Sequence, residues 1–206
     1  MKRLAKIISF LFHPLLMFTY GVGLAMTCTF LSVYPPKMKV LIIGGTFLST
    51  AIFPAVFISL LVWSGAASDL ELTNRKERVL PYLIFLCSAL ACVYFLRRLL
   101  LPIWLLGMMI GACVALLLTL GINCFWKISA HSIGIGGLIG GMMGVARILM
   151  INPYWAFIGA ILVAGLLGTS RILLKKHTPM QVYAGFCLGF ICTFVASRMG
   201  FLYVFM

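Results

Sequence analysis

Acidic side chains are almost absent from this sequence. Only three of its 206 residues are Asp or Glu, against sixteen Lys and Arg, and charged residues make up 9% of the chain. Soluble proteins carry about 25% charged residues, so this chain has too few to cover a surface that faces water. The three acids, Asp69, Glu71 and Glu77, also lie within one short stretch. This scarcity argues against a soluble protein, a two-carboxylate hydrolase and a carboxylate-held magnesium site.

Paired cysteine motifs are missing as well. The chain has seven cysteines, none of them in a Cys-x-x-Cys pair, and nearly all lie within apolar stretches. Buried thiols in such surroundings are usually inert. We therefore expect these cysteines to pack in the interior without a redox role.

Long hydrophobic runs make up most of the sequence. Hydrophobic residues form 64% of the chain, compared with about 45–50% in globular proteins. A helix needs about 20 apolar residues to cross a bilayer. We expect an all-α, polytopic transmembrane helix bundle of six to seven spans that forms a single domain over residues 1–206. The seven candidate spans are 8–33, 40–63, 79–96, 99–122, 132–150, 153–173 and 180–204.

The loops between these spans divide unequally. Loops 64–78, 123–131 and 174–179 follow spans two, four and six, so all three open on one side of the membrane. They hold most of the reactive side chains of the sequence. Those in the loops are Arg75, Lys76, Arg78, Lys127, His131, Lys175, Lys176 and His177, and Arg171 lies just inside the sixth span. We expect these groups to converge on one site.

The fifth span is rich in glycine. Gly136 and Gly140, and likewise Gly137 and Gly141, form G-x-x-x-G pairs. Small residues on one face let membrane helices approach closely. We expect these glycines to pack against a neighbouring helix rather than to contact a ligand.

Two histidines among several cations predict an oxyanion site. Arginine binds phosphate oxygens in pairs, lysine supplies a point charge, and histidine acts as nucleophile, acid or base near neutral pH. Fixed positive charge would then take the role of a metal ion in phosphoryl chemistry. The alternative is that His131 and His177 simply lie at the membrane interface. His13, which precedes Pro14 within the first span, has no charged neighbour and is interpreted as a helix-packing or lid residue.

Three blocks of the sequence resemble the type 2 phosphatidic acid phosphatases, a family that shares its site with the vanadium haloperoxidases. The family blocks are Lys-x6-Arg-Pro, Pro-Ser-Gly-His and Ser-Arg-x5-His-x3-Asp. The resemblance covers about residues 69–190, and the first two spans carry no motif. The matching segments are the approximate first block from Asn74 to Pro81, the second block Ile128-Ser129-Ala130-His131, and the third block from Ser170-Arg171 to His177.

The resemblance implies a role for each matched residue. His177 would attack phosphorus and form a phosphohistidine, while His131 would protonate the departing oxygen and later activate water. The cationic and hydrogen-bonding wall around the phosphate would consist of Arg75, Lys76, Arg78, Ser129, Ala130, Ser170 and Arg171. No metal and no cofactor are implied.

Gln181 stands where the family usually has Asp, which orients the nucleophilic histidine. Glutamine can hold the imidazole tautomer but supplies no charge, and loss of such a carboxylate costs about 10⁴ in rate in a serine protease. Thr178-Pro179-Met180-Gln181 also reads as a helix capping box. The dolichyl-diphosphate phosphatases, a branch of the family, look similar in carrying Gln here. Glu77 is a candidate for the missing charge.

Together these features predict a metal-independent membrane phosphatase that acts on a lipid phosphate or diphosphate. The substrate would be a polyprenyl diphosphate, a phosphatidate-like lipid or a lipid A-type phosphate, and no nucleic acid is expected as partner. The alternative is a non-catalytic lipid-phosphate binding or transport protein. We expect a bacterial inner (plasma) membrane location with the site on the outer face.

Overall fold

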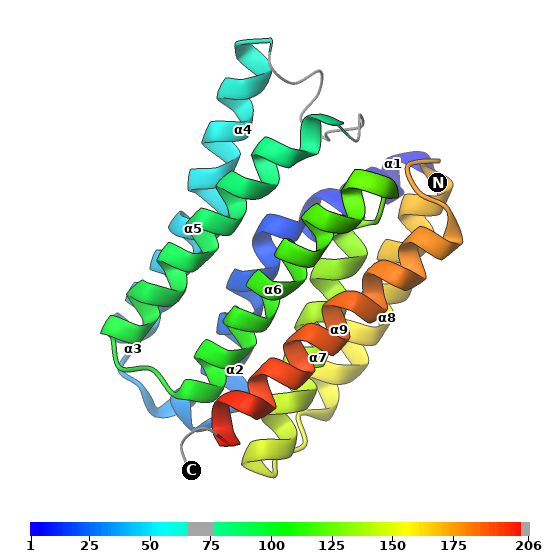
Figure 1. Ribbon diagram of the computed structural model, residues 1–206. Coiled ribbons are helices and arrows are strands. Elements are labelled where there is room, and N and C mark those ends of the chain that lie inside the picture. The colour runs from blue at the N-terminus through cyan, green and yellow to red at the C-terminus, as the bar shows by residue number, and fades with distance from the viewer. Residues whose placement is uncertain (66–75, 203–206) are drawn as a thin grey trace.

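The computed structural model describes residues 1–65 and 76–202, and the regular structure in these residues is helical (Figure 1). Nine α-helices lie in this part of the chain. They are α1 (Lys2–Leu11), α2 (Met17–Cys28), α3 (Pro36–Phe47), α4 (Phe53–Trp63), α5 (Val79–Arg98), α6 (Ile103–Phe125), α7 (Ala130–Leu149), α8 (Tyr154–Leu173) and α9 (Pro179–Leu202). Shorter turns link some of them: η1 (Pro14–Leu16), η2 (Phe30–Val33), η3 (Leu48–Ile52) and η4 (Lys76–Arg78).

Seven helical segments are long and apolar enough to cross a membrane, which confirms the prediction of an all-α integral membrane protein. The first runs over Lys2–Cys28 rather than the predicted 8–33, and each of the other six begins within four residues of the predicted span. The second segment starts at Pro36 rather than residue 40, because proline fits the first turn of a helix without losing a hydrogen bond. The fourth starts at Ile103 rather than residue 99, because Leu100 adopts a left-handed conformation (φ 56°) and Pro102 precedes the helix.

The helices alternate in direction, so their connections gather at two ends of the bundle. Figure 1 shows the end of α4, the start of α5, the α6–α7 turn and the α8–α9 turn at the same end as the N-terminus. This is the arrangement predicted from counting the spans. The reactive loops of the described chain therefore open on one side.

The first membrane segment is interrupted at its middle. Helix α1 ends at Leu11, and His13 and Pro14 separate it from α2. Proline lacks the N–H that would continue the helical ladder and clashes with the preceding turn. The break lets α1 pack against α8 while α2 packs against α3 and α7.

Helix α7 lies at the centre of the bundle and approaches α9 closely. A Cβ atom on Gly136 or Gly140 would collide with the backbone of Phe186 or Phe190 in α9, and one on Gly141 would meet Met108 of α6. The glycine-rich face predicted to pack against neighbouring helices does so. This contact fixes the start of α7 next to the start of α9.

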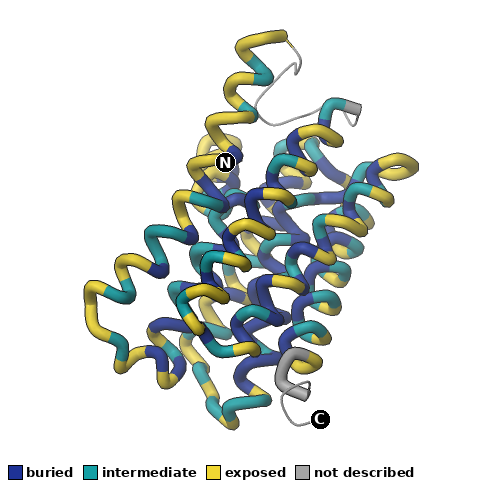
Figure 2. Tube along the Cα trace, turned by 60° about the vertical axis from the view of Figure 1, so that its left-hand side comes forward, coloured by how far each residue is buried: buried dark blue, intermediate teal, exposed yellow. Residues whose placement is uncertain are grey.

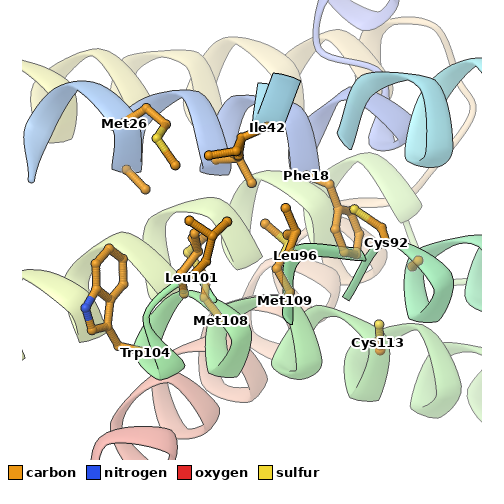
Figure 3. Close-up of a cluster of buried hydrophobic side chains, with 14 of the residues drawn as sticks. Phe18, Met26, Ile42, Cys92, Leu96, Leu101, Trp104, Met108, Met109 and Cys113 are labelled. Carbon is orange, nitrogen blue, oxygen red and sulfur yellow. The ribbon is translucent and has the colours of Figure 1, made fainter. Parts of the chain in front are cut away.

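A second packing region joins α2, α3, α5 and α6. Figure 3 shows Met26, Ile42, Leu96 and Met109, one from each of these helices, within one buried cluster. Exposed residues lie along the outer faces of the bundle (Figure 2). Many of the exposed side chains are large and apolar, among them Trp155 at 85% exposure. Such a surface suits hydrocarbon rather than water.

Candidate functional site

A cavity of about 130 Å³ opens among the helices at the end where the reactive loops gather. Five side chains from separate segments form its polar wall: His13, Arg78, His131, Arg171 and His177. The rest of its wall is mostly apolar and comes from α2, α5, α6 and α7. Four of these residues, Arg78, His131, Arg171 and His177, were predicted site residues, and the structure brings them to one cavity. The fifth, His13, was not among the predicted site residues.

His177 lies in the tight turn between α8 and α9. Helix α8 ends in a Schellman motif, in which the Lys176 N–H donates to the Arg171 carbonyl (3.1 Å) and the Lys175 N–H to the Ile172 carbonyl (2.9 Å). Lys175 takes the left-handed conformation that this motif requires (φ 54°). The reversal turns the chain back over the end of α8, so that His177 is buried against the cavity.

Gln181 holds the His177 ring and caps α9 at the same time. Its side-chain oxygen lies 3.0 Å from Nδ1 of His177 and accepts the Thr178 N–H at 3.2 Å. The Gln181 N–H lies 3.4 Å from the Thr178 hydroxyl, which completes the predicted capping box. The amide oxygen of Gln181 is an acceptor, so Nδ1 of His177 must be the donor and carry the hydrogen. In the neutral ring, Nε2 then has the free lone pair.

The surroundings of His177 keep its imidazole neutral. Burial, together with the positive charges of Arg78, Arg171 and Lys127, lowers the pKa of His177 to about 4, while the hydrogen bond to Gln181 acts in the opposite direction. At neutral pH the ring is therefore uncharged. An uncharged ring with a free Nε2 can act as a nucleophile.

His131 occupies the first turn of α7 and is anchored by α1. Its Nε2 lies 3.1 Å from the Ser9 carbonyl oxygen, which can only accept, so Nε2 carries hydrogen and proton exchange is confined to Nδ1. The electrostatic neighbours of the ring are Arg171, His13 and His177. The Ser9 carbonyl thus orients His131 as the Gln181 amide orients His177.

Two arginines supply the positive wall. Arg171, in the last turn of α8, and Arg78, at the start of α5, are only 4% and 5% exposed, and both line the cavity. Arg78 donates from Nη1 to the Ile128 carbonyl at 3.3 Å, which ties α5 to the α6–α7 turn. The guanidinium groups therefore reach the cavity from opposite sides of the bundle.

Other predicted site residues have different positions. Among the described residues, the cavity wall includes Ala130 but neither Ser129 nor Ser170. The Ser129 hydroxyl caps α7, where it accepts from the Ser132 N–H (3.3 Å) and from the Ser132 hydroxyl (2.9 Å). The Ser170 hydroxyl donates to the Leu166 carbonyl at 2.7 Å, one turn back in α8. Both serines shape the backbone around the cavity.

The first block of the resemblance is only partly covered by the structure. Arg75 lies outside the described residues, and so does the side chain of Lys76, whose backbone begins η4. Glu77 is partly exposed and is not among the residues that line the cavity. Of this block, Arg78 is the residue that the described structure brings to the cavity.

His13, interpreted from the sequence as a helix-packing or lid residue, also lines the cavity. Its ring centroid lies 5.4 Å from that of His131, with the two rings nearly perpendicular (82°). The available signal was the His-Pro pair within an apolar span, because a broken helix exposes polar groups that need partners. His13 has no charged neighbour close in sequence, but Arg78 and Arg171 line the same cavity.

Within the described chain, no three His, Cys, Asp or Glu side chains cluster as ligands for a metal ion. Comparison with known proteins adds no further constraint, since no family model, curated protein or solved structure matches this chain.

Proposed function

We propose that this protein is a membrane phosphatase that releases phosphate from a phosphorylated lipid through a phosphohistidine on His177. The observation that carries the proposal is the pairing of His177 with Gln181, which leaves Nε2 as a free lone pair beside Arg78 and Arg171 in one buried cavity. Nucleophile and cations are the two parts that phosphoryl transfer requires of a protein.

In the first step, Nε2 of His177 forms a bond to phosphorus as the bond from phosphorus to the leaving oxygen breaks. Arg78 and Arg171 hold the phosphoryl oxygens, whose negative charge is redistributed in the transition state. In the second step, water attacks phosphorus and the P–N bond breaks, releasing phosphate and the free imidazole. The lowered pKa of His177 favours its return to the neutral state.

His131 is the acid and base in this scheme. Its Nδ1 gives a proton to the leaving oxygen and then takes one from the attacking water, while the Nε2 hydrogen remains on the Ser9 carbonyl. Arg171 is an electrostatic neighbour of both imidazoles. One guanidinium can therefore hold the phosphoryl group between its nucleophile and its acid.

The apolar part of the cavity supports a lipid as substrate. Phe18, Phe85, Met108 and Leu116 line it below the polar end, and they come from the membrane-spanning segments. A substrate chain would lie among them while its phosphate lies among the cations. A polyprenyl diphosphate, a phosphatidate-like lipid and a lipid A-type phosphate all fit this description.

Phosphate release by purified protein tests the proposal. We expect release from a lipid phosphate or diphosphate that is undiminished by a metal chelator, and loss of at least about 10³-fold in His177→Ala. The wild type should also carry an acid-labile phosphoryl label that this variant lacks. Full activity of His177→Ala would overturn the assignment of the nucleophile.

A second candidate is a protein that binds or transports lipid phosphate without turnover. Gln181 favours it, because a neutral amide cannot stabilise positive charge on a phosphorylated imidazole as a carboxylate can. This candidate predicts lipid-phosphate binding that survives His177→Ala and no phosphate release from any lipid by the wild type.

We further propose that the cavity faces outward from a bacterial inner membrane. Ser64 is exposed at the end of α4, on the same side as the site. A Ser64→Cys variant, made after replacing the seven native cysteines, should react in intact cells with a membrane-impermeant maleimide. Labelling only after the cells are opened would place the site in the cytoplasm.

A further inference from the structure

His13 occupies a defined position beside the proposed acid. The break after α1 places it at the cap of η1, where its Nδ1 accepts the Leu15 N–H at 3.4 Å. A nitrogen that accepts has no hydrogen, so in the neutral ring Nε2 carries it and is a donor. The ring meets that of His131 edge-on at the cavity. His13 therefore adds a donor to the polar wall.

The polar groups follow an order across the cavity. The His13 ring lies against that of His131, with centroids 5.4 Å apart, and Arg171 is an electrostatic neighbour of both His131 and His177. Arg171 is common to both histidines, and His13 belongs to the His131 side. Since a phosphoryl group attacked by His177 releases its leaving group away from the nucleophile, His13 lies on the leaving-group side.

A donor in this position suits one kind of leaving group. In a lipid monophosphate the leaving oxygen is bonded directly to carbon, which cannot accept a hydrogen bond. In a lipid diphosphate the leaving group is itself a phosphate, with several acceptor oxygens and negative charge. A donor beyond the acid would contact those oxygens.

We infer that His13 binds the inner phosphate of a lipid diphosphate and gives the site its preference for diphosphates over monophosphates. This inference rests on the proposed function. His177 bonds to the terminal phosphorus, the bridging P–O bond breaks, and a proton from His131 balances the charge. The products are a lipid monophosphate, held by His13, and after hydrolysis free phosphate.

The test compares farnesyl diphosphate with farnesyl monophosphate as substrates. In His13→Leu we expect kcat/KM to fall about 10–100-fold for the diphosphate, the worth of a charge-assisted hydrogen bond, and no more than about 3-fold for the monophosphate. His13→Gln, whose amide N–H can replace Nε2–H, should restore most of the difference. An equal loss on both substrates would mean that His13 acts only by supporting His131, and it would overturn the inference, as would no loss at all.

Binding separates this inference from the proposed function. In the His177→Ala background, the dissociation constants of the two ligands are measured with and without His13→Leu. A selective loss of diphosphate affinity supports the role of His13 in binding diphosphate, whether or not the wild type shows turnover. Absence of turnover in the wild type would overturn only the proposed phosphatase activity. Should His13→Leu fail to fold, the His13→Gln and His13→Asn pair replaces it, and equal diphosphate affinity in both would contradict the inference.

Discussion

The side-chain oxygen of Gln181 accepts from both the His177 ring, at 3.0 Å, and the backbone N–H of Thr178, the residue that caps α9, at 3.2 Å. One amide thus performs a structural and a chemical task. The backbone N–H fixes which end of the amide faces the ring, and the ring tautomer follows from that. The sequence left open a helix cap and a partner for the His177 ring, and the same oxygen makes both contacts.

Replacing Gln181 with Glu tests the missing charge. Glutamate has the length of glutamine and can accept the same two hydrogen bonds, so the capping box should persist. Its negative charge should raise the pKa of His177 from about 4 and stabilise a phosphorylated ring, increasing turnover by about tenfold or more. Gln181→Leu, which removes both bonds, should lose activity and about 1 kcal/mol of stability. A fall in turnover in Gln181→Glu would indicate a site tuned to the neutral amide.

The pH dependence of activity should reflect the buried imidazole. Because the neutral ring is the proposed nucleophile and its pKa is about 4, the acidic limb of kcat/KM assigned to His177 should lie near pH 4 instead of near 6.5. In Gln181→Glu that limb should move to higher pH. A limb that stays in place in this variant would show that another group controls it.

Stability should depend on pH through the same group. The folded-state pKa of about 4 is below the ordinary value of 6.5, so the unfolded chain binds more protons between these values. Stability is then fully present above pH 6.5 and falls as the pH is lowered toward 4. The thermal midpoint in detergent should decrease less over this window in His177→Gln than in the wild type.

The Arg171→Lys variant should distinguish the effect of the planar guanidinium group from the effect of its positive charge. Lysine keeps the positive charge but cannot bind two phosphate oxygens in parallel, so we expect kcat/KM to fall about 10²-fold. Arg147→Lys is the matched control, because Arg147 is exposed in the last turn of α7, at the opposite end from the site. It should retain full activity. Equal effects in the two variants would contradict a specific role for Arg171.

Two glycines offer a matched test of the α7–α9 contact. Gly140→Ala places a Cβ against the backbone of Phe190 and should cost about 1–3 kcal/mol through overpacking. Gly159→Ala, in α8, meets nothing within 4 Å and should be neutral or slightly stabilising, since alanine favours the helix. Thermal unfolding in detergent measures both. A neutral Gly140→Ala would show that the helices can separate without loss.

Hydropathy predicted the seven membrane segments because their lengths are set by the bilayer and not by details of packing. It placed the ends less well where proline or a left-handed residue decides them, as at Pro36 and Leu100. The one-sided distribution of loops followed from the number of spans. Sequence alone was therefore sufficient for the topology of the described chain.

The candidate site was predicted unevenly for a physical reason. We predicted His131, Arg171 and His177 from short segments that resemble family motifs, and these three residues line one cavity together with Arg78. His13 is more than a hundred residues from His131 in sequence, and their contact depends on how the broken first segment packs against α7. The helix-capping role of Ser129 depends equally on where α7 begins.

The interruption of the first membrane segment affects how the protein can be made. The Ser9 carbonyl and His13 contribute one wall of the cavity, while His177 is synthesised more than 160 residues later. A nascent chain inserted through α7 holds two of the three histidines and lacks His177, the proposed nucleophile. Conversely, a shortened protein that starts after residue 16 would keep all three family-like blocks yet lose the carbonyl that orients His131. The amino-terminal helix thus contributes to the cavity, and its packing partner α8 is synthesised more than 140 residues after it.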